Sequence, residues 1–318
     1  MLKENEIFEK MNQLGNERKP FVFIIDFLKL NGIVLPLNEL NDEIQFEIKG
    51  KQVAFDGEID LTKYPVPLEI YRSQFEQAQS AFKSKNVDLI NLTCETSIEI
   101  NLNLDEIFKH SNAKYKLLLK DQFVCFSPET FVKIHEGKIC AYPMKGTIDA
   151  SIADAKHWIL NHPKEIEEHQ LTVDWVKDEL SRVAENVEVK KFRFIDEIKT
   201  HDKTLLQVSS EVCGKMPSDF HSNLGSIFDQ LLPASSICGA PKEKAFELIK
   251  SVEKYERGFY TGIFGIYDGN DVDSAVLIRF IEKKSDQLVF KSGGGITAKS
   301  DLNNEYNELI SKIYVPIN

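Results

Sequence analysis

The hydrophobic positions along the chain follow a strand period in some segments and a helix period in others. Phe21–Phe27 is a run of aromatic and β-branched residues typical of a buried strand, and residues 191–194 alternate charged and aromatic side chains. Residues 71–85 space their apolar side chains as a helix does, and the charged stretch 150–186 has the same character. The pattern therefore predicts a chain that uses both kinds of element.

The predicted elements come in clusters of strands and clusters of helices. Strands are expected over 87–93, 123–126, 131–135, 138–142, 187–213, 259–267, 273–282 and 287–291, and helices over 218–232, 241–255 and 301–313. Pro241 stands at the first-turn position that suits proline. Clustering of this kind favours an α+β fold over a doubly wound parallel sheet. Since no linker or repeat interrupts the chain, residues 1–318 are expected to form one domain.

Composition narrows the range of partners. The 318 residues include 39 basic and 50 acidic side chains, a formal net charge of −11, which argues against binding to nucleic acid. The first 20 residues lack the apolar stretch of a signal peptide. Residues 21–37 are interrupted by Asp26, Lys29 and Asn31, and are too short and too polar to span a membrane.

Cysteine and histidine usage gives no sign of a metal centre. The five cysteines are odd in number, widely spaced and without a C-x-x-C pair. We therefore expect neither a disulfide framework nor a zinc site, and we expect a location in the reducing cytoplasm. The seven histidines show no metal-ligand spacing, and His169 is as well explained by packing or exposure as by a place in a site.

Four segments place glycine or proline beside reactive side chains. They are residues 127–129 (SPE), 143–147 (PMKGT), 233–242 (PASSICGAPK) and 292–297 (SGGGIT). Successive glycines let backbone amides converge on an anion, although a flexible connection explains them equally well. In the last helix, Glu305 and Glu308 are three residues apart and share one face, where they can bind one cation or simply face solvent.

In this order and spacing, the four segments resemble the chorismate-utilising enzymes, a family that includes anthranilate, aminodeoxychorismate, isochorismate and salicylate synthases. The resemblance extends from about residue 91 to the C-terminal helix, whereas residues 1–65 resemble the family only vaguely and look short. It implies a single chorismate-binding domain with its catalytic core in residues 66–318. It also implies antiparallel sheets packed as a sandwich, with helices on the outside.

The resemblance assigns a role to most of the candidate residues. It implies a Mg²⁺ site formed by Glu168, Glu305 and Glu308, and substrate contacts from Thr147, Gln207, Ala240, Arg279, Gly293, Gly294, Gly295 and Lys312. Arg279 and Lys312 would bind carboxylates of chorismate, and the glycines would form a carboxylate cradle. Glu129 would be the general acid that protonates the departing hydroxyl, which requires a raised pKa.

Lys145 distinguishes the members of the family. Anthranilate synthases have alanine before the Gly-Thr pair, whereas aminodeoxychorismate synthases of the better-studied type have a lysine proposed to attack ring carbon 2 as a covalent nucleophile. Such a lysine must be neutral when it attacks, which desolvation and neighbouring cations favour. Isochorismate and salicylate synthases activate water with another lysine, at the position of Leu89 in this chain. The resemblance is therefore greatest to aminodeoxychorismate synthase component I, on the route to p-aminobenzoate and folate.

Alternatives stay open at this point. They are an anthranilate synthase component I, an isochorismate or salicylate type of enzyme, and a binding subunit without catalysis. Three positions depart from the family, since Gln207 replaces a histidine, Cys238 a threonine, and Ile266 a tyrosine expected near the pyruvyl carboxylate. We expect Cys238 to be a small buried thiol. Because the chain shows no glutaminase motif, ammonia is expected from a separate glutamine amidotransferase subunit.

Overall fold

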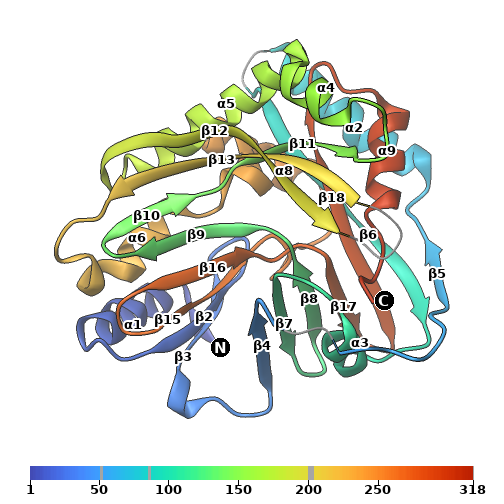
Figure 1. Ribbon diagram of the computed structural model, residues 1–318. Helices are drawn as coiled ribbons and strands as arrows, with labels where there is room; N and C mark the ends of the chain where they lie inside the picture. Colours follow the sequence, from blue (N-terminus) through green and yellow to red (C-terminus); the bar gives the residue numbers. More distant parts are fainter. Residues whose placement is uncertain (51–52, 85–86, 200–203, 318) are drawn as a thin grey trace.

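Two antiparallel sheets organise the molecule (Figure 1). The computed structural model describes residues 1–50, 53–84, 87–199 and 204–317, and within them one sheet has ten strands and the other eight. The larger sheet has the order β1-β3-β2-β15-β16-β9-β10-β13-β11, with β12 paired to β13. The smaller has the order β14-β6-β18-β17-β8-β7-β4, with β5 paired to β6.

The strands of the larger sheet are β1 (Leu2–Lys3), β2 (Phe21–Ile25), β3 (Asn31–Pro36), β9 (Thr130–His135), β10 (Lys138–Ala141), β11 (Met144–Asp149), β12 (Glu185–Lys199), β13 (Thr204–Lys215), β15 (Ile263–Tyr267) and β16 (Val272–Val276). Those of the smaller are β4 (Ile44–Ile48), β5 (Leu61–Tyr64), β6 (Leu89–Ile100), β7 (Tyr115–Leu119), β8 (Phe123–Ser127), β14 (Gly239–Ala240), β17 (Phe280–Lys284) and β18 (Gln287–Thr297). The helices are α1 (Glu4–Asn16), α2 (Leu68–Lys83), α3 (Leu104–His110), α4 (Ala155–Asn161), α5 (Pro163–Leu180), α6 (Leu224–Leu231), α7 (Ser235–Cys238), α8 (Lys242–Val252) and α9 (Leu302–Ser311), with short 3₁₀ turns at Leu37–Glu39 and Phe220–Asn223.

The uninterrupted apolar run of β2 is explained by its place in the middle of the sandwich. Side chains of a strand alternate between its faces. Phe23 joins the cluster under α1 and α6, while Ile24 joins the cluster that faces the smaller sheet. In the smaller sheet, α2, α8 and α9 cover the outer face of β6 and β18. The predicted α+β sandwich with helices outside is therefore confirmed.

Three local predictions were wrong. The strand predicted over 273–282 is two strands, β16 and β17, which belong to different sheets, and Arg279 stands between them with a left-handed φ of 55°. The glycines of 293–295 continue β18 instead of forming a loop. Pro241 precedes α8 as its N-cap. In the first case the pattern of apolar residues was recognised, but it gave no signal of the crossing between the two sheets.

Cys140 and Cys213 form a disulfide, contrary to the expectation of a chain without one. They are 73 residues apart in sequence but directly opposite in the ladder between β10 and β13. The expectation of a cytoplasmic location loses the support it drew from unpaired cysteines. In the described part of the chain, no helix combines the length and the apolar character needed to cross a membrane.

Candidate active site

The glycine segment forms the floor of the site. Residues 293–295 of β18 pair with residues 91–93 of β6. A Cβ atom at Gly293 would come 2.5 Å from the Cγ2 atom of Thr93, so the close approach of β6 requires glycine there. A Cβ atom at Gly294 would instead lie at ordinary contact distance from side chains of the last helix. The second glycine therefore faces the site and the first faces the neighbouring strand.

The C-terminal helix brings two carboxylates and an ammonium group over this floor. A Cβ atom at Gly294 would be 3.5 Å from Glu305 Oε2, 3.5 Å from Glu308 Oε1 and 3.6 Å from Lys312 Nζ. Lys312 donates to the carbonyl of Gly293 at 2.8 Å and pairs with Glu308 at 2.7 Å. Helical spacing brings the three charged groups to one face, as the sequence predicted for the two glutamates.

The two carboxylates differ in their environment. Burial raises the pKa of Glu305; the hydrogen bond donated by Ser300 at 2.7 Å opposes this effect, and the negative charge of Glu308 adds to it. Burial acts in the same direction on Glu308, but Lys312, Lys145 and other cations outweigh it, so the pKa of Glu308 is lowered. Glu308 is therefore the more readily ionised of the two.

Lys145 approaches the glycine floor from the larger sheet. It lies in β11, and its Nζ atom is 3.9 Å from Glu168 Oε2 of α5. The same Nζ atom lies 4.0 Å from the Cβ position of Gly295, and Leu89 Cδ1 lies 3.2 Å from that position. Strand β11, helix α5 and the glycine floor thus converge, while β10 and β13 separate β11 from β9 in the sheet.

Glu129 lies just before β9 and accepts a hydrogen bond from Ser236 Oγ at 2.7 Å. Burial raises the pKa of Glu129, while this hydrogen bond and the charges of Arg279 and Lys312 oppose the rise. Glu129 and Ser236 also line a cavity of about 40 Å³. A carboxyl group with a raised pKa fits the predicted general acid. Sequence reasoning missed Ser236, whose only signal was its place in the 233–242 segment.

Arg279 lies beside the ring of Tyr314, with its guanidinium 5.5 Å from the ring centroid and its Nε atom donating to the hydroxyl at 3.2 Å. Its charge opposes the rise in the pKa of Glu129 and helps to lower the pKa of Glu308, which places it among the site residues. The charge of Arg279 also acts on the buried Tyr260. Ile266 instead lies within β15, opposite Val22 and Asp273 of the larger sheet. Tyr314 and Tyr260, rather than a residue at position 266, are therefore tyrosines near the arginine.

The remaining predicted residues flank this arrangement. Thr147 of β11 lies opposite Gln207 of β13, and Ala240 of β14 lies opposite Leu89. Cys238 is fully buried, and burial raises its pKa to about 12, as expected for an inert thiol. His169 is buried and hydrogen-bonded to Ser210 at 2.7 Å, and it lies against the backbone of Lys145, so it packs beside the site.

A buried ion pair beneath the floor was not anticipated. Arg257 donates to both carboxylate oxygens of Glu253, at 2.8 and 2.7 Å. It also donates to the carbonyls of Asn91 and Ile237 at 2.6 and 2.9 Å. Glu253 in turn accepts from the amide and hydroxyl of Thr93 at 2.9 and 2.7 Å. The pair therefore joins β6, below the glycines, to the α7 segment that holds Ser236.

Comparison with known proteins identifies the family of the chain. The chorismate binding enzyme family matches residues 42–318. An uncharacterized PabA-like protein of Haemophilus influenzae is 48% identical over 314 residues, which cover 97% of this chain and 96% of that protein. A 2-amino-4-deoxychorismate synthase of Streptomyces globisporus is 31% identical over 193 residues, or 59% of this chain and 38% of that enzyme. The menaquinone-specific isochorismate synthase MenF of Escherichia coli has the same fold, with a TM-score of 0.76 at 14% identity over 98% of this chain and 81% of its own.

Proposed function

The chain belongs to the chorismate binding enzyme family, and we propose that it replaces the hydroxyl group at ring carbon 4 of chorismate with an amino group. The observation that carries this proposal is the position of Lys145, 4.0 Å from the Cβ position of Gly295 and 3.9 Å from Glu168. An amine at this point can reach a ring held over the glycine floor. Leu89, at the position where hydroxylating members have their lysine, offers no base to activate water.

The proposed reaction has two substitution steps. Lys145 Nζ bonds to ring carbon 2, the ring double bonds shift, and the hydroxyl at carbon 4 leaves as water with a proton from Glu129. Ammonia then bonds to carbon 4 and gives one proton to Glu129, the double bonds shift back, and the bond from carbon 2 to Lys145 breaks. The sum is chorismate plus ammonia giving 4-amino-4-deoxychorismate plus water. Arg279, Lys312 and the backbone of 293–295 would hold the carboxylates of the substrate.

The carboxylates of the site fit a magnesium ion. Glu305 and Glu308 converge on one point above Gly294, and Glu168 Oε2 lies 3.9 Å from Lys145 Nζ. Carboxylates, together with water, are the ligands that Mg²⁺ takes, and the ion when bound would neutralise the ring carboxylate of chorismate. The charges of Lys312 and Lys145 both act on Glu308, so two ammonium groups lie near this carboxylate. This supports binding of the anionic substrate beside the magnesium ion.

Amination at carbon 2 is the second candidate. The Streptomyces relative is named for a product with its amino group on carbon 2, and it matches 59% of this chain. Direct attack of ammonia on carbon 2 would need no nucleophilic lysine. The placement of Lys145 therefore favours the first candidate, and the position of the amino group in the product separates the two.

The test is to incubate the purified chain with chorismate, Mg²⁺ and an ammonium salt at alkaline pH, and to identify the product. The 4-amino and 2-amino isomers have equal mass, so proton NMR must assign the amino position. We expect the 4-amino product, its loss when EDTA removes Mg²⁺, and no product when glutamine replaces ammonium in the absence of an amidotransferase. Anthranilate, a 2-amino product or isochorismate would each contradict the proposal.

A further inference from the structure

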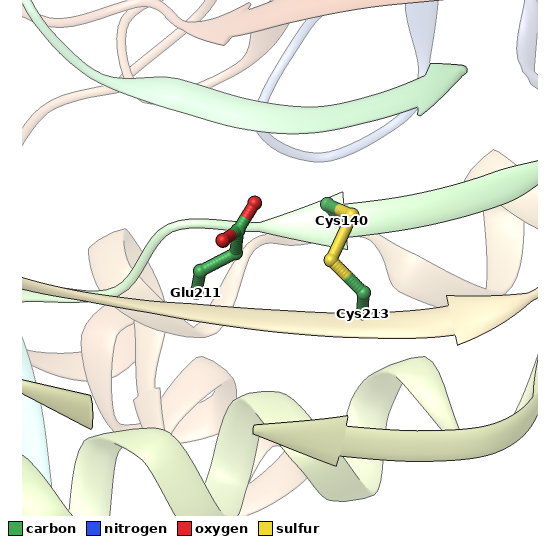
Figure 2. Close-up of side chains that lie close together, drawn as sticks. All are labelled: Cys140, Glu211 and Cys213. Carbon is green, nitrogen blue, oxygen red and sulfur yellow. A yellow bond between two sulfur atoms is a disulfide. The ribbon is translucent and has the colours of Figure 1, made fainter. Parts of the chain in front are cut away.

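One face of the larger sheet carries a cluster of ligand groups that the proposed reaction does not use. Cys140 on β10 lies directly opposite Cys213 on β13, with their Cα atoms 4.2 Å apart. Glu211 lies two residues before Cys213, so its side chain points to the same face. Figure 2 shows the three side chains together, between the two strands.

The three groups offer a ligand set for a soft divalent cation. The two sulfur atoms and a carboxylate oxygen lie within 4.8 Å of one another. Cys213 is buried, whereas Cys140 and Glu211 are half-buried, so the cluster is reached from solvent. Thiolates bind Zn²⁺ at about 2.3 Å, and three protein ligands with one water complete a tetrahedral site. Opposed side chains of an antiparallel pair are about 4.5–5.5 Å apart at Cβ, a span that one ion bridges.

We propose that Cys140, Cys213 and Glu211 form a binding site for a thiophilic divalent cation, Zn²⁺ or Cd²⁺, when the disulfide is reduced. The site is independent of the proposed reaction. Two thiolates select soft metals over Mg²⁺, so the site does not compete for the cation of the carboxylate cluster. Disulfide and metal are mutually exclusive, because the same sulfur atoms form either the bond or the ligands.

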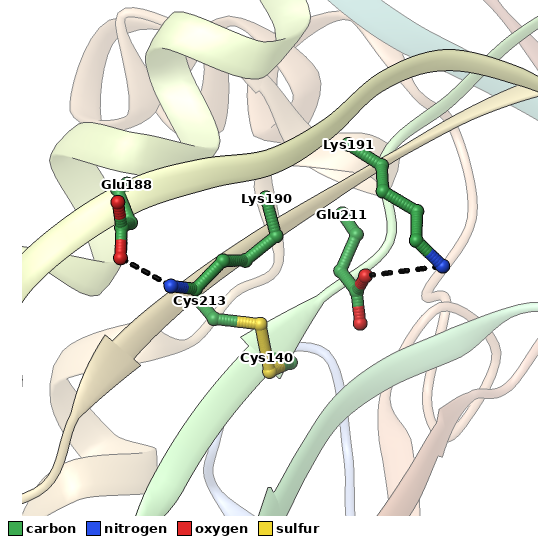
Figure 3. Close-up of a disulfide and its surroundings, with 6 residues drawn as sticks. All are labelled: Cys140, Glu188, Lys190, Lys191, Glu211 and Cys213. Carbon is green, nitrogen blue, oxygen red and sulfur yellow. Dashed lines mark hydrogen bonds and ion pairs between the residues drawn. A yellow bond between two sulfur atoms is a disulfide. The ribbon is translucent and has the colours of Figure 1, made fainter.

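Neighbouring side chains contact the carboxylate of the cluster. Lys191 of β12 pairs with Glu211 at 3.9 Å (Figure 3). Tyr142 is hydrogen-bonded to Glu211. This hydrogen bond orients the carboxylate, as partners of metal ligands do.

Reduction of the disulfide and binding of the cation require a phosphine, one water molecule and the cation. A phosphine reductant breaks the bond between the two sulfur atoms and becomes a phosphine oxide with oxygen from one water, whose two protons go to the two sulfurs. The cation then binds both sulfurs and releases two protons to the buffer.

The experiment is a Cd²⁺ titration of the full chain, reduced with a phosphine or left oxidised, followed by the ultraviolet charge-transfer absorption of cadmium thiolates. We expect one Cd²⁺ per reduced chain and none per oxidised chain. Cys140→Ser should abolish the signal, and Glu211→Gln should weaken binding by about 10- to 100-fold. Cys94→Ser, which removes a buried free cysteine, is the matched control and should bind like the parent chain.

A reduced chain that binds no Cd²⁺, or a Cys140→Ser variant that binds it unchanged, would overturn the proposal. Unchanged binding by Glu211→Gln would show that the carboxylate is not a ligand and would also contradict it. Alkylation of the reduced parent chain is a second measurement that needs no variant. Bound Zn²⁺ should slow the modification of Cys140 and Cys213 but not that of Cys94, and equal rates with and without Zn²⁺ would count against the site.

Discussion

The raised pKa that Glu129 needs as a general acid also makes its ionised form unfavourable in the folded chain. Burial raises the pKa of this carboxyl in the folded chain above its ordinary value of 4.5. Stability from the protonated group is therefore fully present below pH 4.5 and is lost as the pH rises through the raised value. A neutral isostere at this position avoids the loss, and it keeps an acceptor for the hydroxyl of Ser236.

Glu129→Gln should consequently be more stable than the parent chain at pH 8 but not at pH 4, as measured by thermal unfolding. Its rate of chorismate amination should fall by about 100- to 10,000-fold, because the general acid is removed. Glu243→Gln, at an exposed position in α8, is the control and should change neither quantity. Equal stability of Glu129→Gln and the parent chain at both pH values would contradict this account of Glu129.

The orientation of the glycines in strand β18 can be tested by substitution. A Cβ atom at Gly293 would lie 2.5 Å from Thr93 Cγ2 and 2.6 Å from the carbonyl oxygen of Leu92, whereas one at Gly294 meets its neighbours at 3.5 Å or more. We expect Gly293→Ala to destabilise the fold by about 1–3 kcal/mol in urea unfolding. Gly294→Ala should fold normally and lose activity, since its methyl group fills the space between α9 and the floor. The reverse pattern would show that the two glycines have been assigned to the wrong faces.

The sequence predicted elements better than it predicted their connections. Phe21–Phe27 was recognisable as a strand because it is buried on both faces, and Asp301 to Ile313 as a helix because its charges share one face. The split of 273–282 was invisible, since Leu277 is fully buried in the crossing between the sheets and looks like part of a strand. Residues of the site could be predicted where a motif assigned them a role, but no motif assigned one to Ser236, and Arg257 lies outside the motifs.

The ion pair between Arg257 and Glu253 joins the smaller sheet to the segment around Ser236. We expect it to contribute to the stability of the whole fold. Arg257→Ala leaves the carboxylate of Glu253 buried without its partner, and we expect a loss of about 3–5 kcal/mol in the free energy of unfolding. The double variant Arg257→Met, Glu253→Met should recover part of that loss, because well-packed apolar side chains replace buried pairs at little cost. A single variant within 1 kcal/mol of the parent chain would refute this role.

The net charge of the whole molecule differs from the charge of the side chains around the glycine floor. The formal charge of −11 describes the surface, whereas Lys145, Lys312 and Arg279 gather around the glycine floor. For the proposed dicarboxylate substrate, these three cations would provide local attraction within an acidic protein. The disulfide also belongs to the whole molecule, because only the pairing of β10 with β13 brings Cys140 and Cys213 together.

Attack by Lys145 on chorismate is the central claim, and the amino position in the product of Lys145→Ala tests it most directly. The parent chain and the exposed-lysine control Lys244→Ala should form the 4-amino product at equal rates. In Lys145→Ala we predict that the 4-amino product falls at least about 100-fold and that any remaining product carries its amino group on carbon 2. Undiminished 4-amination by a folded Lys145→Ala chain would contradict the account.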